Sequence, residues 1–103
     1  DAMEKGQRTT RYQIEFAPAA LEDLASYDAS TRQRLANRIE WLAKNATQIQ
    51  HQRLSHLPPH LHGLCKYRVG RDRVLYWIDH EQRKIAVFRI MPRKADYRLL
   101  RRS

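Results

Sequence analysis

The chain has 103 residues, a length that suits one domain and excludes a multidomain enzyme, and 20 Lys and Arg against 11 Asp and Glu give a formal net charge of +9. With 42% hydrophobic residues it can bury a small core. No run of roughly 20 apolar residues and no secretory signal is visible, so we expect a cytoplasmic protein without a membrane partner. The positive charge favours a polyanion, with nucleic acid the first candidate and anionic lipid or an acidic protein next.

The first residues are excluded from the expected fold. Residues 1–11 are polar and show no periodicity, so we interpret them as a disordered leader or a cloning remnant before a single domain over residues 12–103. The domain opens with apolar side chains that alternate with polar ones, as in a half-buried strand; the apolar ones are Tyr12, Ile14 and Phe16.

Two helices are predicted next. Pro18 is tolerated in a first helical turn, and apolar residues follow it at helical spacing. Ser30 and Gln33 have the spacing of a capping box, which predicts a longer helix over residues 31–46. Because about two residues join the helices, we expect an antiparallel hairpin with one apolar face.

Residues 47–63 are expected to form a long connection. They hold four of the five histidines and the adjacent Pro58 and Pro59. These prolines exclude helical i, i+4 geometry between His56 and His60, so a solvated loop is favoured over a metal site.

Three strand-like runs follow, over residues 64–69, 73–79 and 85–91, and predict an antiparallel meander. With the first strand they give an α+β fold: a four-stranded, mainly antiparallel sheet with the helical hairpin on one face. A very basic segment at residues 94–102 predicts a short C-terminal helix.

Alternation along the meander separates a core face from a cationic face. The predicted core residues are Cys65, Tyr67, Val69, Val74, Tyr76, Ile78, Ala86, Phe88 and Ile90. If Arg71 and Asp72 form a two-residue loop, parity places basic residues on the opposite face, namely Lys66, Arg68 and Arg73. A three-residue loop would break this arrangement. Parity also turns Arg89 away from the core, and salt bridges to Asp72 or Asp79 are an alternative, purely structural role for these arginines.

Four stretches of the chain are similar to one known family. They are YQIEFAPAALEDL at 12–24, the helical-hairpin pattern to about residue 46, LCKYRVGRDRVLYWID at 64–79 and RIMPRKADYR at 89–98. Over residues 12–100 the chain resembles the RelE/ParE toxin superfamily of bacterial toxin–antitoxin systems. The resemblance implies a RelE-like fold and a cognate antitoxin as partner.

The RelE branch further implies an endoribonuclease that cleaves messenger RNA in the ribosomal A site, beside 16S rRNA, without a metal or other cofactor. The residues that fall on its catalytic positions are Lys66, Arg68, Arg73, Arg93 and Tyr97. Further candidates for RNA contact are Arg71, Arg89, Lys94 and Arg98. Many relatives carry His or Lys just before the late arginine, where this chain has Pro92.

Cleavage without a metal uses the RNA 2′-hydroxyl as nucleophile on the adjacent phosphate. Arg73, together with Arg68 and Arg93, suits the binding of phosphate oxygens, because guanidinium is always charged and forks onto two oxygens. Lys66 is the candidate base, because neighbouring cations and burial lower a lysine pKa. Tyr97 is suited to stacking on a base, to orienting the 2′-hydroxyl, or to proton transfer.

Two alternatives remain open. A non-catalytic ParE-like toxin would bind DNA gyrase, although that branch usually lacks the full catalytic set found here. A basic RNA-binding module would show steep salt dependence and no cleaved product.

Overall fold

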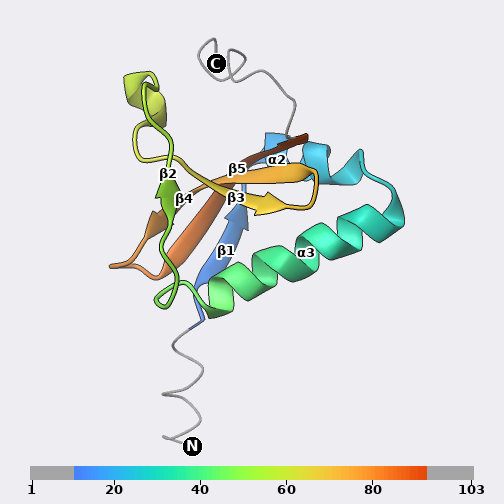
Figure 1. The fold of residues 1–103 in the computed structure, drawn as a ribbon, viewed down its shortest axis with the longest axis horizontal. Coiled ribbons are helices and arrows are strands. Elements are labelled where there is room, and N and C mark those ends of the chain that lie inside the picture. Colours follow the sequence, from blue (N-terminus) through green and yellow to red (C-terminus); the bar gives the residue numbers. More distant parts are fainter. Residues whose placement is uncertain (1–10, 93–103) are drawn as a thin grey trace, which may run out of the picture.

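The computed structural model describes residues 11–92, which form a five-stranded sheet, two α-helices and one 3-10 turn (Figure 1). The elements are β1 (Gln13–Phe16), α2 (Pro18–Ala25), α3 (Ala29–Lys44), β2 (Gln52–Arg53), η1 (Pro59–Leu61), β3 (Cys65–Val69), β4 (Asp72–Asp79) and β5 (Lys84–Pro92). The strand order is β1-β5-β4-β3-β2, with β1 parallel to β5 and every other pair antiparallel. The α+β class and the mainly antiparallel sheet are therefore confirmed.

The prediction of four strands is wrong, because the described sheet has a fifth. The connection before the meander contributes β2, which pairs Gln52 with Lys66 and Arg53 with Cys65. A two-residue strand has no periodicity of its own and exists only because β3 offers it an edge. The predicted C-terminal helix and residues 1–10 of the predicted leader lie outside the described residues. Arg11, which we had placed in the leader, binds Glu40 through Nε at 2.5 Å and Nη2 at 2.7 Å.

Both predicted helices are present, but the second, predicted over residues 31–46, begins and ends two residues earlier. Pro18 occupies the first turn of α2, as expected. At the start of α3 the Asp28 carboxylate accepts a hydrogen bond from the backbone N–H of Thr31 at 2.9 Å, so Asp28 is the N-cap and the Ser30–Gln33 capping box is not used. Asp and Ser are equally good caps, so residue type alone does not decide between Asp28 and Ser30.

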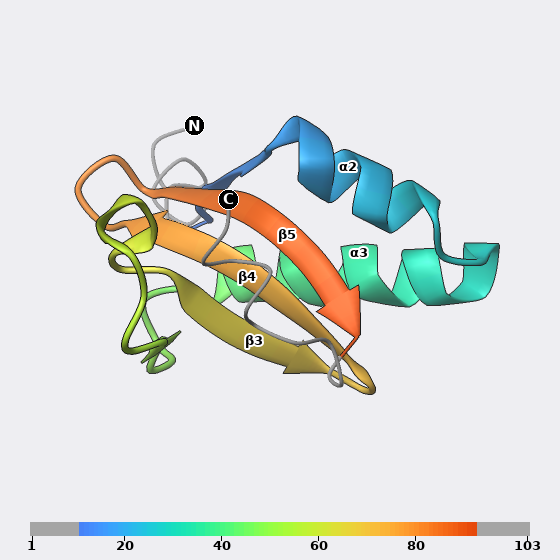
Figure 2. The ribbon, with the colours of Figure 1, turned by 90° about the horizontal axis from the view of Figure 1, so that it is seen from above.

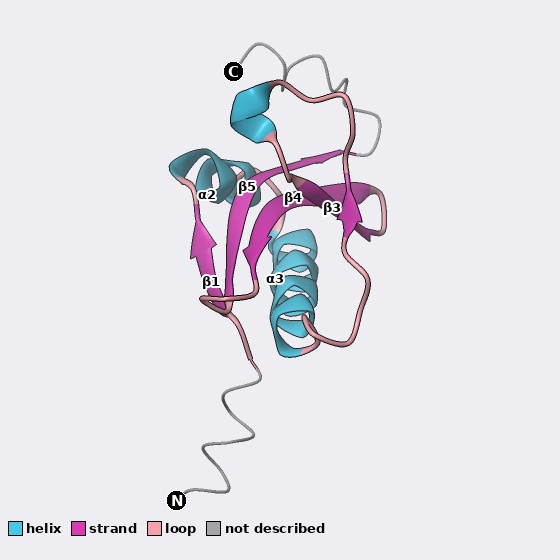
Figure 3. Cartoon of the chain, turned by 90° about the vertical axis from the view of Figure 1, so that its left-hand side faces the viewer, coloured by secondary structure: helices cyan, strands magenta, loops and turns pink. Residues whose placement is uncertain are grey.

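The main core lies between the sheet and the helices, with α3 across one sheet face (Figure 3). Its fully buried members are Tyr12, Ala20, Leu35, Ile39, Leu42, Ala43, Ala46, Cys65, Val69, Val74, Tyr76, Ile85, Val87 and Ile90. Both helices contribute to this cluster, α2 through Ala20 and α3 through Leu35, Ile39, Leu42 and Ala43. Each large side chain buried here contributes about 1.5–3 kcal/mol of favourable transfer free energy.

A β-bulge changes which residues of β5 face the core, so the predicted core residues of this strand are partly wrong. The pairing between β4 and β5 shifts at Leu75 and Tyr76, so that Leu75 lies opposite Arg89 and Tyr76 opposite Val87. The extra residue is Phe88, and the core residues of β5 are Ile85, Val87 and Ile90 rather than Ala86, Phe88 and Ile90. A bulge inserts one residue into one strand and therefore reverses the alternation beyond it.

A second, smaller core covers part of the sheet face opposite α3. Figure 2 shows β3, β4 and β5 in front, with α3 behind the sheet. Its buried members are Leu61, Leu64, Leu75 and Met91, packed with Leu54, Leu57, Trp77 and Phe88. The segment around η1 supplies half of this cluster, and the indole N–H of Trp77 donates to the backbone carbonyl of His62 at 3.0 Å. The long connection is thus a folded cover over one end of the sheet.

Candidate functional site

Three basic side chains share the sheet face opposite α3. In β3, Lys66 and Arg68 alternate with Tyr67, and in β4 Arg73 lies directly opposite Arg68. Residues paired across antiparallel strands point to the same face, so the predicted cationic face is confirmed for these three residues. We refer to Lys66, Arg68 and Arg73 as the cationic row.

The hairpin loop that sets this parity differs from the expected one. Val69 pairs with Asp72, so the two loop residues are Gly70 and Arg71, not Arg71 and Asp72. The observed register differs from the expected one by two residues, which leaves the parity unchanged because side chains alternate with a period of two. Gly70 has a φ of 61°, in the left-handed region that glycine adopts without strain.

The cationic row depresses the pKa of its lysine. Burial, then the charge of Arg73, then that of Arg68 hold the pKa of Lys66 below its ordinary value. Both causes penalise the ammonium form, since one removes water and the other adds like charge. Within residues 11–92 no carboxylate forms an ion pair with Lys66 or Arg68. The neutral amine is therefore more accessible than in an isolated lysine.

The two aspartates proposed as salt-bridge partners are occupied elsewhere. Asp72 is buried on the core face and accepts a hydrogen bond from the Tyr27 hydroxyl at 2.8 Å. The carboxylate of Asp79 accepts from the backbone N–H of Gln82 at 3.0 Å. Arg68 is exposed and keeps its charge available to a ligand, whereas Arg73 is half-buried.

Arg89 is held by a carboxylate that the sequence reasoning missed. Its Nε and Nη2 donate to Asp23 of α2 at 2.7 Å and 3.0 Å, and the backbone N–H of Ile90 donates to the same carboxylate at 2.9 Å. Asp23 lies in α2, and nothing in its local sequence pairs it with a residue of β5. Arg89 is thus already paired, and its contact with RNA stays a prediction.

The remaining site residues are placed only in part. Arg71 is exposed at the tip of the β3–β4 hairpin, beside the cationic row. The other predicted residues lie outside the described part of the chain; they are Arg93, Lys94, Tyr97 and Arg98. The described chain ends at Pro92, which follows Met91, the residue paired with Arg73.

The histidines and the cysteine have structural partners or lie on the surface. His51 lies between the Tyr76 hydroxyl, 2.6 Å from Nδ1, and the Ala46 carbonyl, 2.8 Å from Nε2. Cys65 is buried, and burial raises the pKa of its thiol. Among residues 11–92, no three His, Cys, Asp or Glu side chains gather closely enough to hold a metal ion.

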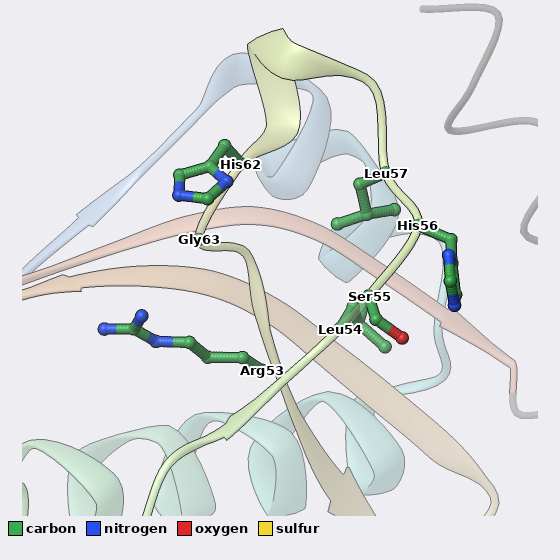
Figure 4. A pocket seen from close by; sticks show the side chains of 7 residues that line it. All are labelled: Arg53, Leu54, Ser55, His56, Leu57, His62 and Gly63. Atoms are coloured by element: carbon green, nitrogen blue, oxygen red, sulfur yellow. The ribbon is translucent and has the colours of Figure 1, made fainter.

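A small hollow lies under the segment that leads to η1. Its lining residues are Arg53, Leu54, Ser55, His56, Leu57, His62 and Gly63. Figure 4 shows Arg53 and His62 on one side of this segment and His56 turned to the other. The two histidines therefore do not face a common ligand.

The geometry of the cationic row suits a phosphodiester. Two guanidinium groups on neighbouring strands can hold non-bridging phosphate oxygens, and an amine of lowered pKa beside them can accept a proton. Such preorganised cations stabilise extra negative charge on phosphorus in a transition state.

Comparisons with known proteins agree on one family. The family model described as "ParE toxin of type II toxin-antitoxin system, parDE" matches residues 14–97. No curated protein sequence matches the chain. Within residues 11–92, neither helix is long and apolar enough to cross a membrane.

Solved toxin structures share the fold. The RelBE2 toxin–antitoxin complex from Mycobacterium tuberculosis matches with a TM-score of 0.69 and 22% identity, over 84% of this chain and 95% of that one. A mutant of the E. coli toxin RelE in the free state matches with a TM-score of 0.67 and 16% identity, over 88% and 93%. The chromosomal ParDE system from P. aeruginosa matches with a TM-score of 0.61 and 18% identity, over 81% and 97%.

Proposed function

This chain belongs to the ParE toxin family, within the RelE/ParE superfamily, and is a toxin of a type II toxin–antitoxin system. We propose that it is an endoribonuclease that cleaves messenger RNA in the ribosomal A site. The observation that carries the proposal is the cationic row of Lys66, Arg68 and Arg73, in which burial and then the two arginines lower the pKa of Lys66.

The proposed reaction needs one base and one acid. Neutral Lys66 takes the proton of the RNA 2′-hydroxyl, and the 2′-oxygen attacks the adjacent phosphorus. The bond from phosphorus to the 5′-oxygen breaks, which leaves a 2′,3′-cyclic phosphate on one fragment. The departing 5′-oxygen takes a proton, for which Tyr97 is the candidate donor, and becomes a 5′-hydroxyl.

The arginines carry the electrostatic part. Arg68 and Arg73 project from facing positions of β3 and β4, so both guanidinium groups can engage the same phosphate group. Their fixed charge stabilises the dianionic phosphorane without a proton transfer. Arg93 completes this set in the proposal.

Primer-extension mapping of a message in a bacterial translation reaction tests the proposal. The wild-type protein is expected to cut at in-frame codons only when ribosomes are present. Arg73→Ala and Tyr97→Phe are each expected to reduce the cleavage rate by about 100- to 1000-fold if the side chain acts in the transition state. Arg32→Ala is the matched control, because Arg32 is exposed on α3 and donates to the Tyr27 carbonyl, away from the row.

Two results would contradict the proposal. Cleavage that persists in Arg73→Ala would remove the cationic row from the chemistry. Growth arrest by the wild type without any cut message would show that the toxin acts on another target.

Gyrase binding is the second candidate function. The family model that matches is that of the ParE toxin, and the ParDE system from P. aeruginosa shares the fold. In this case Arg73→Ala leaves toxicity largely intact, and the purified protein inhibits DNA supercoiling by gyrase. A gyrase supercoiling assay with the wild-type toxin and with Arg73→Ala decides between the two targets.

The cognate antitoxin is the partner that the family membership supplies. We propose that a segment of it covers the cationic face or displaces the C-terminal segment. Either arrangement would neutralise charge that the toxin carries in excess.

A further inference from the structure

An aromatic pair lies between α3 and β3, with one ring exposed and the other half-buried. The Trp41 side chain from α3 is 39% exposed, and its ring lies nearly parallel to that of Tyr67 from β3, at 6° and 6.2 Å between centroids. The guanidinium carbon of Arg38, one turn earlier in α3, lies over both rings, 5.0 Å from the Trp41 centroid and 5.6 Å from that of Tyr67. We name Arg38, Trp41 and Tyr67 the stacking platform.

Within residues 11–92 the positive charge of Arg38 has no carboxylate partner. Glu40 is the acidic residue nearest to Arg38 in sequence, and it is engaged by Arg11. In the part of the chain that the structure describes, no carboxylate forms an ion pair with Arg38. Exposed large apolar side chains are also rare there, since Trp41 is joined only by Leu21 of α2. An exposed indole beside an unneutralised guanidinium indicates a surface that a partner covers.

The stacking platform adjoins the cationic row across the edge of the sheet. Tyr67 lies between Lys66 and Arg68 in β3, with its ring on the α3 side while the two basic side chains point to the other. A shallow hollow at this edge is lined by residues of both groups, including Lys66, Tyr67 and Arg68. β2 pairs only with Cys65 and Lys66, so it does not cover the edge of β3 beyond Lys66. A flexible polyanion can therefore pass from one face to the other around this edge.

We propose that the stacking platform binds an unpaired base of RNA whose phosphates lie along Lys66 and Arg68. Flat aromatic and guanidinium surfaces stack on bases of any sequence, and cations on both sides of one strand track a phosphate backbone. The inference rests on the proposed function in taking RNA as the partner, and it adds a contact outside the reacting groups. An acidic peptide would also satisfy the charges, but it has no use for the flat ring surface.

Fluorescence tests the platform directly, because the chain has two tryptophans. In a Trp77→Phe background the emission comes from Trp41 alone. The probe is a short 2′-O-methyl oligoribonucleotide of mixed sequence, which lacks the free 2′-hydroxyl and so cannot be cleaved. We expect it to quench Trp41 as it binds, since a base that stacks on the ring shields it.

Variants in the otherwise native chain, read by anisotropy of a labelled probe, separate stacking from charge. Trp41→Leu is expected to weaken binding about 5- to 150-fold, the usual effect of losing one stacked base, while Trp41→Phe stays close to the wild type. Arg38→Gln is expected to weaken binding and to reduce the slope of log K against log salt by up to about 0.7. The matched control, Arg32→Gln, lies about 120° around α3 from Arg38 and is expected to bind as the wild type does.

The outcomes distinguish this inference from the proposed nuclease. Two results together would overturn the platform, whether or not the toxin cuts RNA. One is wild-type affinity for the oligonucleotide in a folded Trp41→Leu protein, and the other is no quenching of Trp41 fluorescence in the Trp77→Phe protein. Quenching by poly-glutamate but not by the oligonucleotide would also overturn it, in favour of an acidic protein partner. Quenching by the oligonucleotide, with the Trp41→Leu loss, supports the platform even if no message is cleaved.

Discussion

The charge state of Lys66 depends on the arginines beside it, which makes its pKa a measurable property of the cationic row. Like charge disfavours the ammonium form, so removal of a neighbouring cation must raise the pKa. Arg68→Gln is therefore expected to raise the pKa of Lys66 towards its ordinary value, although burial and Arg73 still hold it below. An NMR pH titration that follows the Cε and Hε resonances of Lys66 measures this pKa shift.

The direction of the change has a kinetic counterpart. If Lys66 is the base, a higher pKa leaves less neutral amine at neutral pH, so Arg68→Gln slows cleavage and moves the rising limb of the pH–rate profile to higher pH. Arg32→Gln removes the same charge at a distant exposed site and is expected to leave the Lys66 titration in place. A Lys66 pKa that does not move in Arg68→Gln would show that the two side chains do not interact.

Strand alternation was enough to place the cationic row from sequence. Lys66 and Arg68 are two apart in one strand, and the parity relation to Arg73 tolerates the two-residue difference in register that the structure shows. The sequence could not place Asp23 beside Arg89, because that contact joins an early helix to the last described strand and leaves no periodic trace.

Among the elements, the β3–β4 hairpin fixes the register of the cationic row, and its turn depends on Gly70. The φ of 61° at this position is strained for a residue with a Cβ atom. Gly70→Ala is expected to lower the free energy of unfolding by about 1–2 kcal/mol, measured by chemical denaturation. A Cβ there would meet Arg34 Nη2 at 3.5 Å, an ordinary contact, so the loss comes from the backbone and not from a clash.

Gly70→Asn provides the control for that interpretation. Asn tolerates the left-handed region better than Ala does, so the loss is expected to be smaller despite the larger side chain. A larger loss for Asn than for Ala would point to steric crowding and would contradict the backbone explanation.

One carboxylate of α2, that of Asp23, bonds to two residues of β5, Arg89 and Ile90. β1 pairs with β5 only from Lys84 to Val87, and beyond that point Asp23 accepts the hydrogen bond of the Ile90 N–H. Asp23→Ala leaves this buried N–H without a partner, so we expect a loss of about 1–3 kcal/mol in urea denaturation. Arg89→Met removes only a part-exposed ion pair, and its loss is expected to be roughly 0–1 kcal/mol.

A comparison of these two variants checks which interaction dominates. If Arg89→Met destabilises the fold as much as Asp23→Ala does, the ion pair and not the backbone hydrogen bond holds α2 in place. Asp23→Asn adds a further test, because its amide oxygen still accepts from Ile90 while the charge is lost.

At the element scale, long periodic segments were predictable and tertiary contacts were not. β1, both helices and the three meander strands follow from apolar spacing and turn residues that act locally. By contrast, β2 exists only by pairing with β3, and the bulge at Phe88 arises from how β4 and β5 fit together. The second core could not be predicted, because the leucines that the connection contributes to it have neither helical nor strand spacing.

At the scale of the whole molecule, positive side chains without a carboxylate partner within residues 11–92 lie on both sides of the β3 edge. The cationic row lies on one sheet face and the stacking platform on the other, and both lack a carboxylate to neutralise Lys66, Arg68 or Arg38 within residues 11–92. A polyanion that contacts both groups must bend around this edge. Neither face alone accounts for the whole proposed contact.

The salt dependence of RNA binding separates this local contact from general attraction to a chain of net charge +9. Each phosphate neutralised on a single strand contributes about −0.7 to the slope of log K against log salt, so three contacts from the cationic row give roughly −2. Arg68→Gln should lose about 0.7 of that slope, measured by anisotropy between about 50 and 200 mM salt. Arg32→Gln lowers the net charge equally, but the Arg32 side chain lies on α3, against the sheet face opposite the row. An equal change of slope in Arg68→Gln and Arg32→Gln would mean that net charge, and not the row, governs binding. Only a protein that contacts phosphates at defined positions responds differently to the loss of one arginine than to the loss of another.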